Sequence, residues 1–262
     1  MVNSPLENEL HPTGARPHAR GALGVVIVAA GRGERLGLDV PKSFVQLHGR
    51  RLLEFGVATV TSLPHAGHLV IVVPEGRAAE TLALVDQVLP PTSAWEATVA
   101  VGGRERHESV RFGLDALPDS VETVLVHDAA RPFASAELFE RVLAEVLRTG
   151  DAVIPAIPVV DTLKRIDGDG VVHETVDRAP LAAVQTPQGF VREQLAAAHA
   201  TAQLQGGAGL LPTDDADLVQ RAGGTVRTVA GEQRAHKLTT RADLAVLEAL
   251  YAQGVAEALE LR

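Results

Sequence analysis

Short apolar runs alternate with amphipathic stretches through the first half of the chain. Strand-like runs lie at 24–29, 69–73, 97–101, 123–127 and 152–155. Between them, apolar residues recur three or four positions apart, the spacing of one helix face. These residues are Leu53, Val57 and Val60; Leu82, Val85 and Leu89; Val110, Leu114 and Leu117; and Leu138, Val142 and Val146. The alternation predicts an α/β fold, a three-layer α/β/α sandwich around a mainly parallel sheet.

The segment 157–185 interrupts this rhythm. Two short apolar runs, 162–166 and 171–176, flank Asp-Gly-Asp-Gly at 167–170, which has the composition of a hairpin turn. A hairpin this small cannot bury a core of its own, so we expect a protruding arm that acts in dimerisation or as a lid. Helical and strand patterns then return at 191–204, 214–221 and 225–229, followed by a last helix with Leu244, Leu247 and Tyr251.

Composition narrows the class of protein. The chain has 262 residues, a formal net charge of −9 and no cysteine. The negative charge argues against nonspecific nucleic-acid binding, no run is long enough to span a membrane, and the lack of cysteine fits a cytoplasmic protein. Residues 1–21 have no apolar signal-peptide region, so we expect a disordered tail before one domain over 22–262.

The most informative segment is a glycine-containing loop after the first strand. Gly31, Gly33 and Gly37 follow an apolar run, and two cations, Arg35 and Lys42, lie in or just after the loop. Such a loop lets backbone N–H groups approach a polyphosphate whose charge the cations meet. A dinucleotide-binding loop is disfavoured by the G-x-G-x-x-x-G spacing, and a Walker A loop by Pro41. The alternative is that the glycines only form a tight turn and that Arg35 and Lys42 are solvated, with no ligand bound.

Other candidates follow later strands. Asp128, in His-Asp-Ala-Ala-Arg-Pro at 127–132, ends the fourth strand, where one carboxylate beside phosphates could hold Mg²⁺ or could cap the next turn. Arg131 could pair with Asp128 or receive a substrate phosphate.

The segment 102–109, Gly-Gly-Arg-Glu-Arg-His-Glu-Ser, could let its backbone approach a flat base, or be an ordinary loop. Thr-Asp-Asp at 213–215 reads as a helix N-cap, and Lys237 as a lone cation.

Taken together, these segments resemble the 2-C-methyl-D-erythritol 4-phosphate cytidylyltransferases. The resemblance runs from about Gly24 to about Leu250, and its motifs stand in the family's order. They are Ala29-Ala30-Gly31-x-Gly33-x-Arg35 with Pro41-Lys42, Gly102-Gly103-x-x-Arg106-x-x-Ser109, the 127–132 segment, Asp161-Thr162-Leu163-Lys164, Val176-Asp177-Arg178, Gln185-Thr186-Pro187-Gln188, Thr213-Asp214-Asp215 and Lys237-Leu238-Thr239.

The resemblance implies transfer of CMP from CTP to methylerythritol phosphate, with Mg²⁺, in a homodimer whose arms close each other's sites. It implies that Arg35 and Lys42 stabilise charge at the α-phosphate and that Asp128 holds the metal. Around the nucleotide it places Ala29, Ala30, Gly31, Gly33, Gly103, Arg106 and Ser109. The methylerythritol phosphate would meet Arg131, Thr162, Arg178 and Lys237, the last two also acting in catalysis.

Two positions depart from the family's pattern. Ser43 stands where glutamine is common, and Ala235-His236 stands where Asn-Ile usually precedes the late lysine. Two other functions stay open: a cytidylyltransferase for a different polyol phosphate, such as ribitol 5-phosphate, and a nucleotide sensor without activity. Ala130 favours methylerythritol phosphate over ribitol phosphate, and the joint presence of Arg35, Lys42, Asp128 and Lys237 argues against the sensor.

Overall fold

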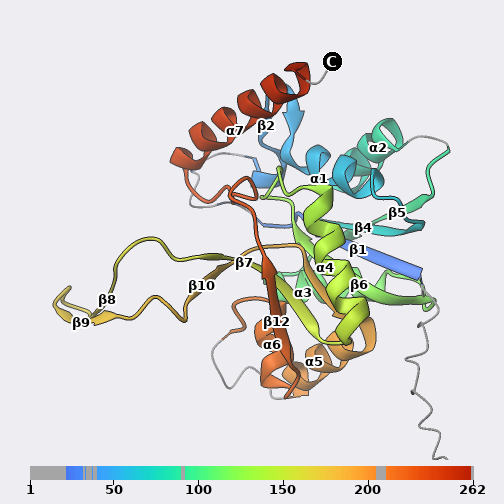
Figure 1. The fold of residues 1–262 in the computed structure, drawn as a ribbon. Helices are drawn as coiled ribbons and strands as arrows, with labels where there is room; N and C mark the ends of the chain where they lie inside the picture. The colour runs from blue at the N-terminus through green and yellow to red at the C-terminus, as the bar shows by residue number, and fades with distance from the viewer. Residues whose placement is uncertain are drawn as a thin grey trace, which may run out of the picture.

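The computed structural model describes residues 22–31, 33, 37, 40–89, 92–204 and 211–260, with side chains up to 254. The expected tail at 1–21 therefore lies outside the described residues. An eight-stranded sheet forms the centre of the molecule (Figure 1). Its strands are β1 Ala22–Val28, β4 Gly67–Val73, β5 Trp95–Val101, β6 Val121–Asp128, β7 Ala152–Pro158, β10 Ala182–Val184, β11 Gln188–Val191 and β12 Val226–Ala230.

The strand order is β10-β7-β11-β6-β1-β4-β5, with β12 also paired to β7. The expected mainly parallel sheet is confirmed, because β1 pairs in parallel with β4 and β6, and β4 with β5. The sequence did not predict the short antiparallel strand β11 between β6 and β7. Its Gly189 lets a helix pack close by: a Cβ there would lie 2.7 Å from both Val142 and Val146.

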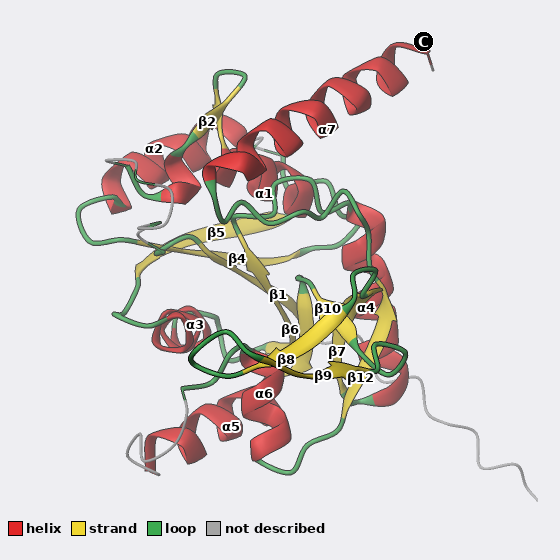
Figure 2. Ribbon diagram, turned by 90° about the vertical axis from the view of Figure 1, so that its left-hand side faces the viewer, coloured by secondary structure: helices red, strands yellow, loops and turns green. Residues whose placement is uncertain are grey.

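Helices cover both faces of the sheet (Figure 2). The bounds are α1 Leu52–Thr61, α2 Ala78–Val88, α3 Arg106–Asp115, α4 Ala136–Thr149, α5 Arg192–Leu204, α6 Asp215–Arg221 and α7 Arg241–Glu260. Apolar residues of α1, α2 and α4 join one core cluster, and those of α3, α5 and α6 join another. One residue of the expected apolar stripes is misplaced: Leu82 is 47% exposed, because α2 buries Thr81, Leu84 and Val85.

A third cluster packs the start of α1 against α7 and the segment before it. It includes Val45, which follows a short 3₁₀ helix, η2 (Lys42–Phe44), and Leu47 of the hairpin β2–β3 (Gln46–Leu47, Arg50–Arg51). Leu238, fully buried in this cluster, donates its N–H to the Ala130 carbonyl at 2.8 Å. This bond brings the segment before α7 against the end of β6.

The segment after β7 leaves the body of the molecule as an extended arm (Figure 1). At its end β8 (Leu163–Ile166) and β9 (Val172–Val176) form a separate antiparallel pair. Val160, Ile166, Val171 and Val172 on this arm are all more than half exposed. In the described part of the chain, no helix has both the length and the apolarity that a membrane span requires.

Candidate active site

A cavity of about 210 Å³ opens where β1, β5 and β6 end. This is the edge at which parallel sheets bind ligands, because the loops after neighbouring strands converge there. Its lining comes from all three loops and from two segments far away in sequence. The lining residues are Val28, Ala30, Gly31, Lys42, Gly103, Arg104, Glu105, Arg106, Ser109, Asp128, Ala130 and Lys237.

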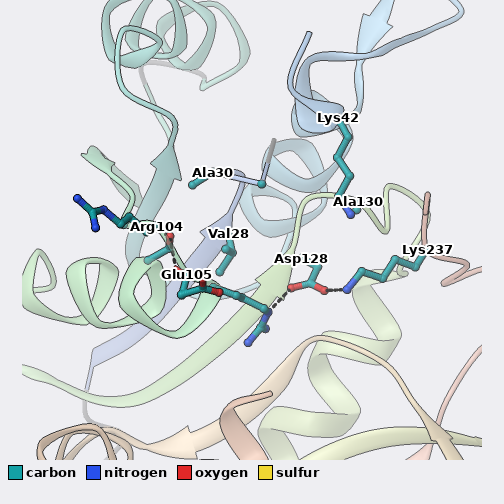
Figure 3. A pocket seen from close by; sticks show the side chains of 12 residues that line it. Val28, Ala30, Lys42, Arg104, Glu105, Asp128, Ala130 and Lys237 are labelled. Atoms are coloured by element: carbon teal, nitrogen blue, oxygen red, sulfur yellow. Dashed lines mark hydrogen bonds and ion pairs between the residues drawn. The ribbon is translucent and has the colours of Figure 1, made fainter. Parts of the chain in front are cut away.

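Asp128 lies between two cations in this cavity. Lys237 Nζ donates to its Oδ2 at 2.6 Å (Figure 3), and Arg106 Nε donates to its Oδ1 at 3.1 Å. The Asp128 residue is only 6% exposed. Burial disfavours its ionised form, but the charges of Arg106 and Lys237 outweigh burial and hold the pKa of Asp128 well below its usual range. A permanent carboxylate therefore faces the cavity.

A hydrogen-bonded chain fixes the backbone of Asp128. Its N–H donates to Thr186 Oγ at 3.0 Å, and that hydroxyl lies 3.1 Å from His127 Nδ1. His127 Nε2 lies 3.2 Å from the Arg131 carbonyl, which can only accept. The proton therefore belongs on Nε2, and Nδ1 accepts from Thr186. Burial lowers the pKa of His127 to about 4, so this ring stays neutral.

Hydrogen bonds between its own residues hold the loop after β5 in place. Ser109 is buried, and its hydroxyl accepts from the Gly103 N–H at 3.1 Å and donates to the Glu105 carbonyl at 3.2 Å. A Cβ on Gly102 would lie 2.4 Å from the Ala30 Cβ. Only glycine therefore lets this loop approach the loop after β1 so closely. Residues of both loops line the cavity.

The predicted lysines reach the cavity from opposite ends of the sequence. Lys42 begins η2, and its Nζ lies 3.3 Å from the Leu238 carbonyl, next to Lys237 (Figure 3). Gly33 and Gly37 have φ values of 71° and 61°, so the turn before Lys42 uses the left-handed backbone that glycine favours. Arg35 lies outside the described residues, so the prediction that it joins Lys42 here is untested.

The two departures from the family's pattern have local partners. Ser43 is 2% exposed, and its hydroxyl donates to the Ala29 carbonyl at 2.6 Å, which ties η2 to the end of β1. Ala235 is fully buried, and its carbonyl accepts from Arg131 Nη1 at 2.7 Å. His236 Nε2 lies 2.7 Å from Asp243 Oδ1 at the start of α7. These contacts hold the Lys237 segment in place.

Some predicted site residues do not line this cavity. Arg131 donates to the carbonyls of Ala235 and Val184, which holds these segments together. Thr162 and Arg178 are exposed on the arm. Ala29 is buried just behind the lining residue Ala30. No observation tests the roles expected for these four residues.

Sequence reasoning missed one buried partner of the site. Asp214 caps α6, as predicted for the Thr-Asp-Asp segment, since its Oδ1 accepts from the Asp217 N–H at 2.8 Å. The next residue, Asp215, is fully buried, and its Oδ2 accepts from Arg106 Nη1 at 2.7 Å. Burial raises the pKa of Asp215, and the Arg106 charge opposes this shift. Only its place in a motif signalled a role beyond capping.

Comparison with known proteins identifies the family. The family model for 2-C-methyl-D-erythritol 4-phosphate cytidylyltransferase matches residues 23–253. The chain belongs to this family. Family membership makes it a nucleotidyltransferase of isoprenoid precursor synthesis, which transfers a cytidylyl group from CTP to methylerythritol phosphate.

Curated relatives and solved structures agree. A cytidylyltransferase of this name from Nocardia farcinica is 43% identical over 230 residues, which cover 88% of this chain and 94% of that protein. A bifunctional enzyme from Clavibacter michiganensis is 46% identical, and the match covers 88% of this chain but only 55% of that longer protein. The crystal structure of the Thermus thermophilus cytidylyltransferase superposes with a TM-score of 0.69 at 38% identity, over 87% of this chain and 98% of that one.

The donor set is compatible with the magnesium ion expected for a cytidylyltransferase. The described residues hold no group of three or more His, Cys, Asp or Glu that could bind a metal ion alone. Mg²⁺, however, is often bound by one carboxylate together with substrate phosphates and water. Asp128 provides that carboxylate, and each of its oxygens has lone-pair capacity beyond the single cation that it meets.

Proposed function

We propose that this cavity is the site of cytidylyl transfer and that its cations stabilise the displacement at the α-phosphorus of CTP. A phosphate oxygen of methylerythritol 4-phosphate forms the new bond to that phosphorus. The bond from the α-phosphorus to the bridging oxygen breaks, and pyrophosphate leaves with the electron pair. The second pKa of a phosphate monoester is about 6, so the attacking oxygen is already ionised and needs no general base.

One observation carries this proposal: Lys42, Lys237 and Arg106 converge with Asp128 on one cavity beside a glycine loop. Cations aimed at a triphosphate stabilise charge that grows on the phosphoryl oxygens and on the leaving group. Lys42 and Lys237 would meet those oxygens, and the backbone at Gly31 and Gly103 would approach the nucleotide. We keep Arg35 in the proposal as a second cation of the first loop.

Asp128 would hold the metal ion. Bound there, Mg²⁺ would neutralise charge on the triphosphate and favour departure of pyrophosphate. Lys237 would pass from Asp128 to a substrate phosphate, since a phosphate offers it a stronger charge partner than a carboxylate already shared with Arg106. Arg131 would support this step by holding the Ala235 segment.

The arm would complete the site in a homodimer. Val160, Ile166, Val171 and Val172 expose apolar surface on a hairpin that extends from the body. Burial of such surface against a second copy is favourable. Thr162 and Arg178, which this subunit leaves exposed, would then reach the methylerythritol phosphate in the other subunit's cavity. A cytoplasmic location is part of the same proposal.

A direct assay tests the reaction. Pyrophosphate release from CTP is measured with methylerythritol 4-phosphate and with ribitol 5-phosphate, offered separately, and with a chelator in a control reaction. We expect fast release only with methylerythritol 4-phosphate and Mg²⁺. Release only with ribitol 5-phosphate would assign the other polyol, and CTP binding without release on either would make the protein a sensor.

A further inference from the structure

The Arg106 guanidinium joins two carboxylates that lie far apart in the sequence. Its Nε donates to Asp128 Oδ1 at 3.1 Å, and its Nη1 donates to Asp215 Oδ2 at 2.7 Å. The planar guanidinium has a rigid set of donors, so two fixed acceptors determine its orientation. The contact with Asp215 has the length of a charge-assisted hydrogen bond. Of the two carboxylates, only Asp128 lines the cavity.

Asp215 lies at the start of a helix and not in a loop of the cavity. It is the first residue of α6, it has no exposed surface, and the capping residue Asp214 precedes it. Asp214 also accepts from Gln188 at 2.9 Å, which ties the start of α6 to β11. Arg106 begins α3, on the same face of the sheet. Asp215 therefore holds the Arg106 guanidinium from a position outside the cavity.

Three buried polar atoms around this contact have no hydrogen-bond partner within the described structure. They are Arg106 Nη2, Asp215 Oδ1 and His199 Nε2. His199 is 4% exposed, and its Nε2 lies 3.8 Å from Asp215 Oδ1. Buried polar atoms without a hydrogen-bond partner are costly. These atoms therefore reduce the stability that the Arg106–Asp215 contact gives.

We propose that Asp215 is a positioning residue for cytidylyl transfer: it holds the Arg106 guanidinium against Asp128 and so fixes how that carboxylate faces the nucleotide's phosphates and their metal ion. Asp215 touches no substrate itself and acts through Arg106. The inference rests on the proposed function of this cavity. Outer partners of a metal-binding carboxylate typically contribute about 10–100-fold to metal affinity or activity.

The first test compares Asp215→Asn with Asp217→Asn. Both positions are acidic residues in the first turn of α6, so both changes remove one charge from the same helix terminus. Asp217, however, pairs with Arg221 at the surface. We expect Asp215→Asn alone to weaken Mg²⁺-dependent CTP binding, measured by calorimetry without acceptor, by about tenfold. Its kcat/KM for CTP should fall at least as much, while KM for methylerythritol phosphate stays unchanged.

A double-mutant cycle separates positioning from a general structural effect. If Asp215 acts through Arg106, then Asp215→Asn should add little to the loss already caused by Arg106→Gln. Independent, multiplying losses in the double variant would overturn the proposal. So would Asp215→Asn binding CTP like the parent protein.

A second variant covers the case in which Asp215→Asn does not fold. Arg106→Lys keeps the charge but cannot span both carboxylates, so we expect the same tenfold weakening of Mg²⁺-dependent CTP binding; parent-like binding would refute the link. The unmodified protein serves as the reference throughout. If it releases no pyrophosphate, the proposed function fails; if it is active and these variants match it, only the role of Asp215 fails.

Discussion

Lys237 and Asp128 are 109 positions apart in the chain, yet Nζ and Oδ2 lie 2.6 Å apart in the cavity. The lysine follows the last strand of the sheet, and the aspartate ends β6. Their contact keeps a buried carboxylate ionised and holds a cation beside the place where we propose that phosphate charge develops. It also links the two halves of the site before any substrate arrives.

Lys42 should be essential for turnover but not for folding. Its side chain is half-buried at the cavity, and removal of one preorganised charge typically costs about 10²–10³ in kcat. We expect this loss for Lys42→Ala, measured by steady-state pyrophosphate release, with an unchanged circular dichroism spectrum. Arg148→Ala, which removes an exposed cation paired with Glu145 on α4, is the control. Near-normal turnover of Lys42→Ala would contradict the role of this lysine.

Metal dependence should be lost together with the carboxylate of Asp128. We expect a chelator to abolish turnover of the unmodified protein and added Mg²⁺ to restore it. For Asp128→Asn we expect turnover to fall at least about 10²-fold, with no recovery at high Mg²⁺, since the neutral amide is a poor ligand. Glu96→Gln, whose side chain is 82% exposed, should respond to metal like the parent. Full activity in the chelator would rule out the metal site.

Gly102→Ala should damage the nucleotide wall of the cavity. The added Cβ would lie 2.4 Å from the Ala30 Cβ and 2.8 Å from Ser109 Oγ, so one loop must move away from the other. Overpacking of this kind costs about 1–3 kcal/mol, and we expect KM for CTP to rise. Gly254→Ala on α7, where a Cβ meets nothing within 4 Å, is the matched control. Equal effects of the two changes would refute the close approach.

Stability should fall between neutral and mildly acidic pH through His199. Burial, assisted by nearby positive charges, lowers the pKa of this histidine to about 4, against about 6.5 in an unfolded chain. The unfolded state therefore binds more protons below pH 6.5, and the free energy of unfolding decreases as pH falls toward 4. At pH 5.5 this amounts to about 1 kcal/mol relative to pH 7.5.

The variant His199→Gln should lack that part of the pH dependence. Urea denaturation of both proteins at pH 7.5, 6.5 and 5.5 measures the difference in unfolding free energy. We expect the unfolding free energy of the parent minus that of the variant to decrease by about 1 kcal/mol from pH 7.5 to pH 5.5. A difference that is constant with pH would show that His199 titrates alike in both states.

The arm should be required for dimers and for activity together. Ile166 and Val172 are 59% and 55% exposed in the single chain. We expect the double change Ile166→Asp and Val172→Asp to give monomers in light scattering and to lower turnover, because the partner's Thr162 and Arg178 no longer reach the cavity. Leu82→Asp, at an exposed apolar position on α2, controls for added charge. An active monomer would refute the role of the arm.

Local sequence patterns were sufficient for much of the fold. Alternating apolar runs and helical stripes predicted β1, β4, β5, β6 and β7 and the helices between them. The reason is that apolar residues in the sequence recur at the same spacing as the buried positions of a helix or strand. The glycine loop after β1 and Asp128 at the end of β6 were likewise recognisable, because a strand's end lies where its apolar run stops. Motifs in a fixed order then indicated the family.

The tertiary structure alone decided which distant residues meet. No pattern within 188–191 predicts a strand between β6 and β7, because the pairing of this strand depends on residues elsewhere in the chain. Its Gly189 is explained only by the close packing of α4. The ion pairs of Asp128 with Lys237 and of Arg106 with Asp215 could not be read from spacing either. The sequence does not distinguish a solvated charged side chain from a buried one. Packing determines which charged side chains are buried, and a buried charge is stable only when it is paired.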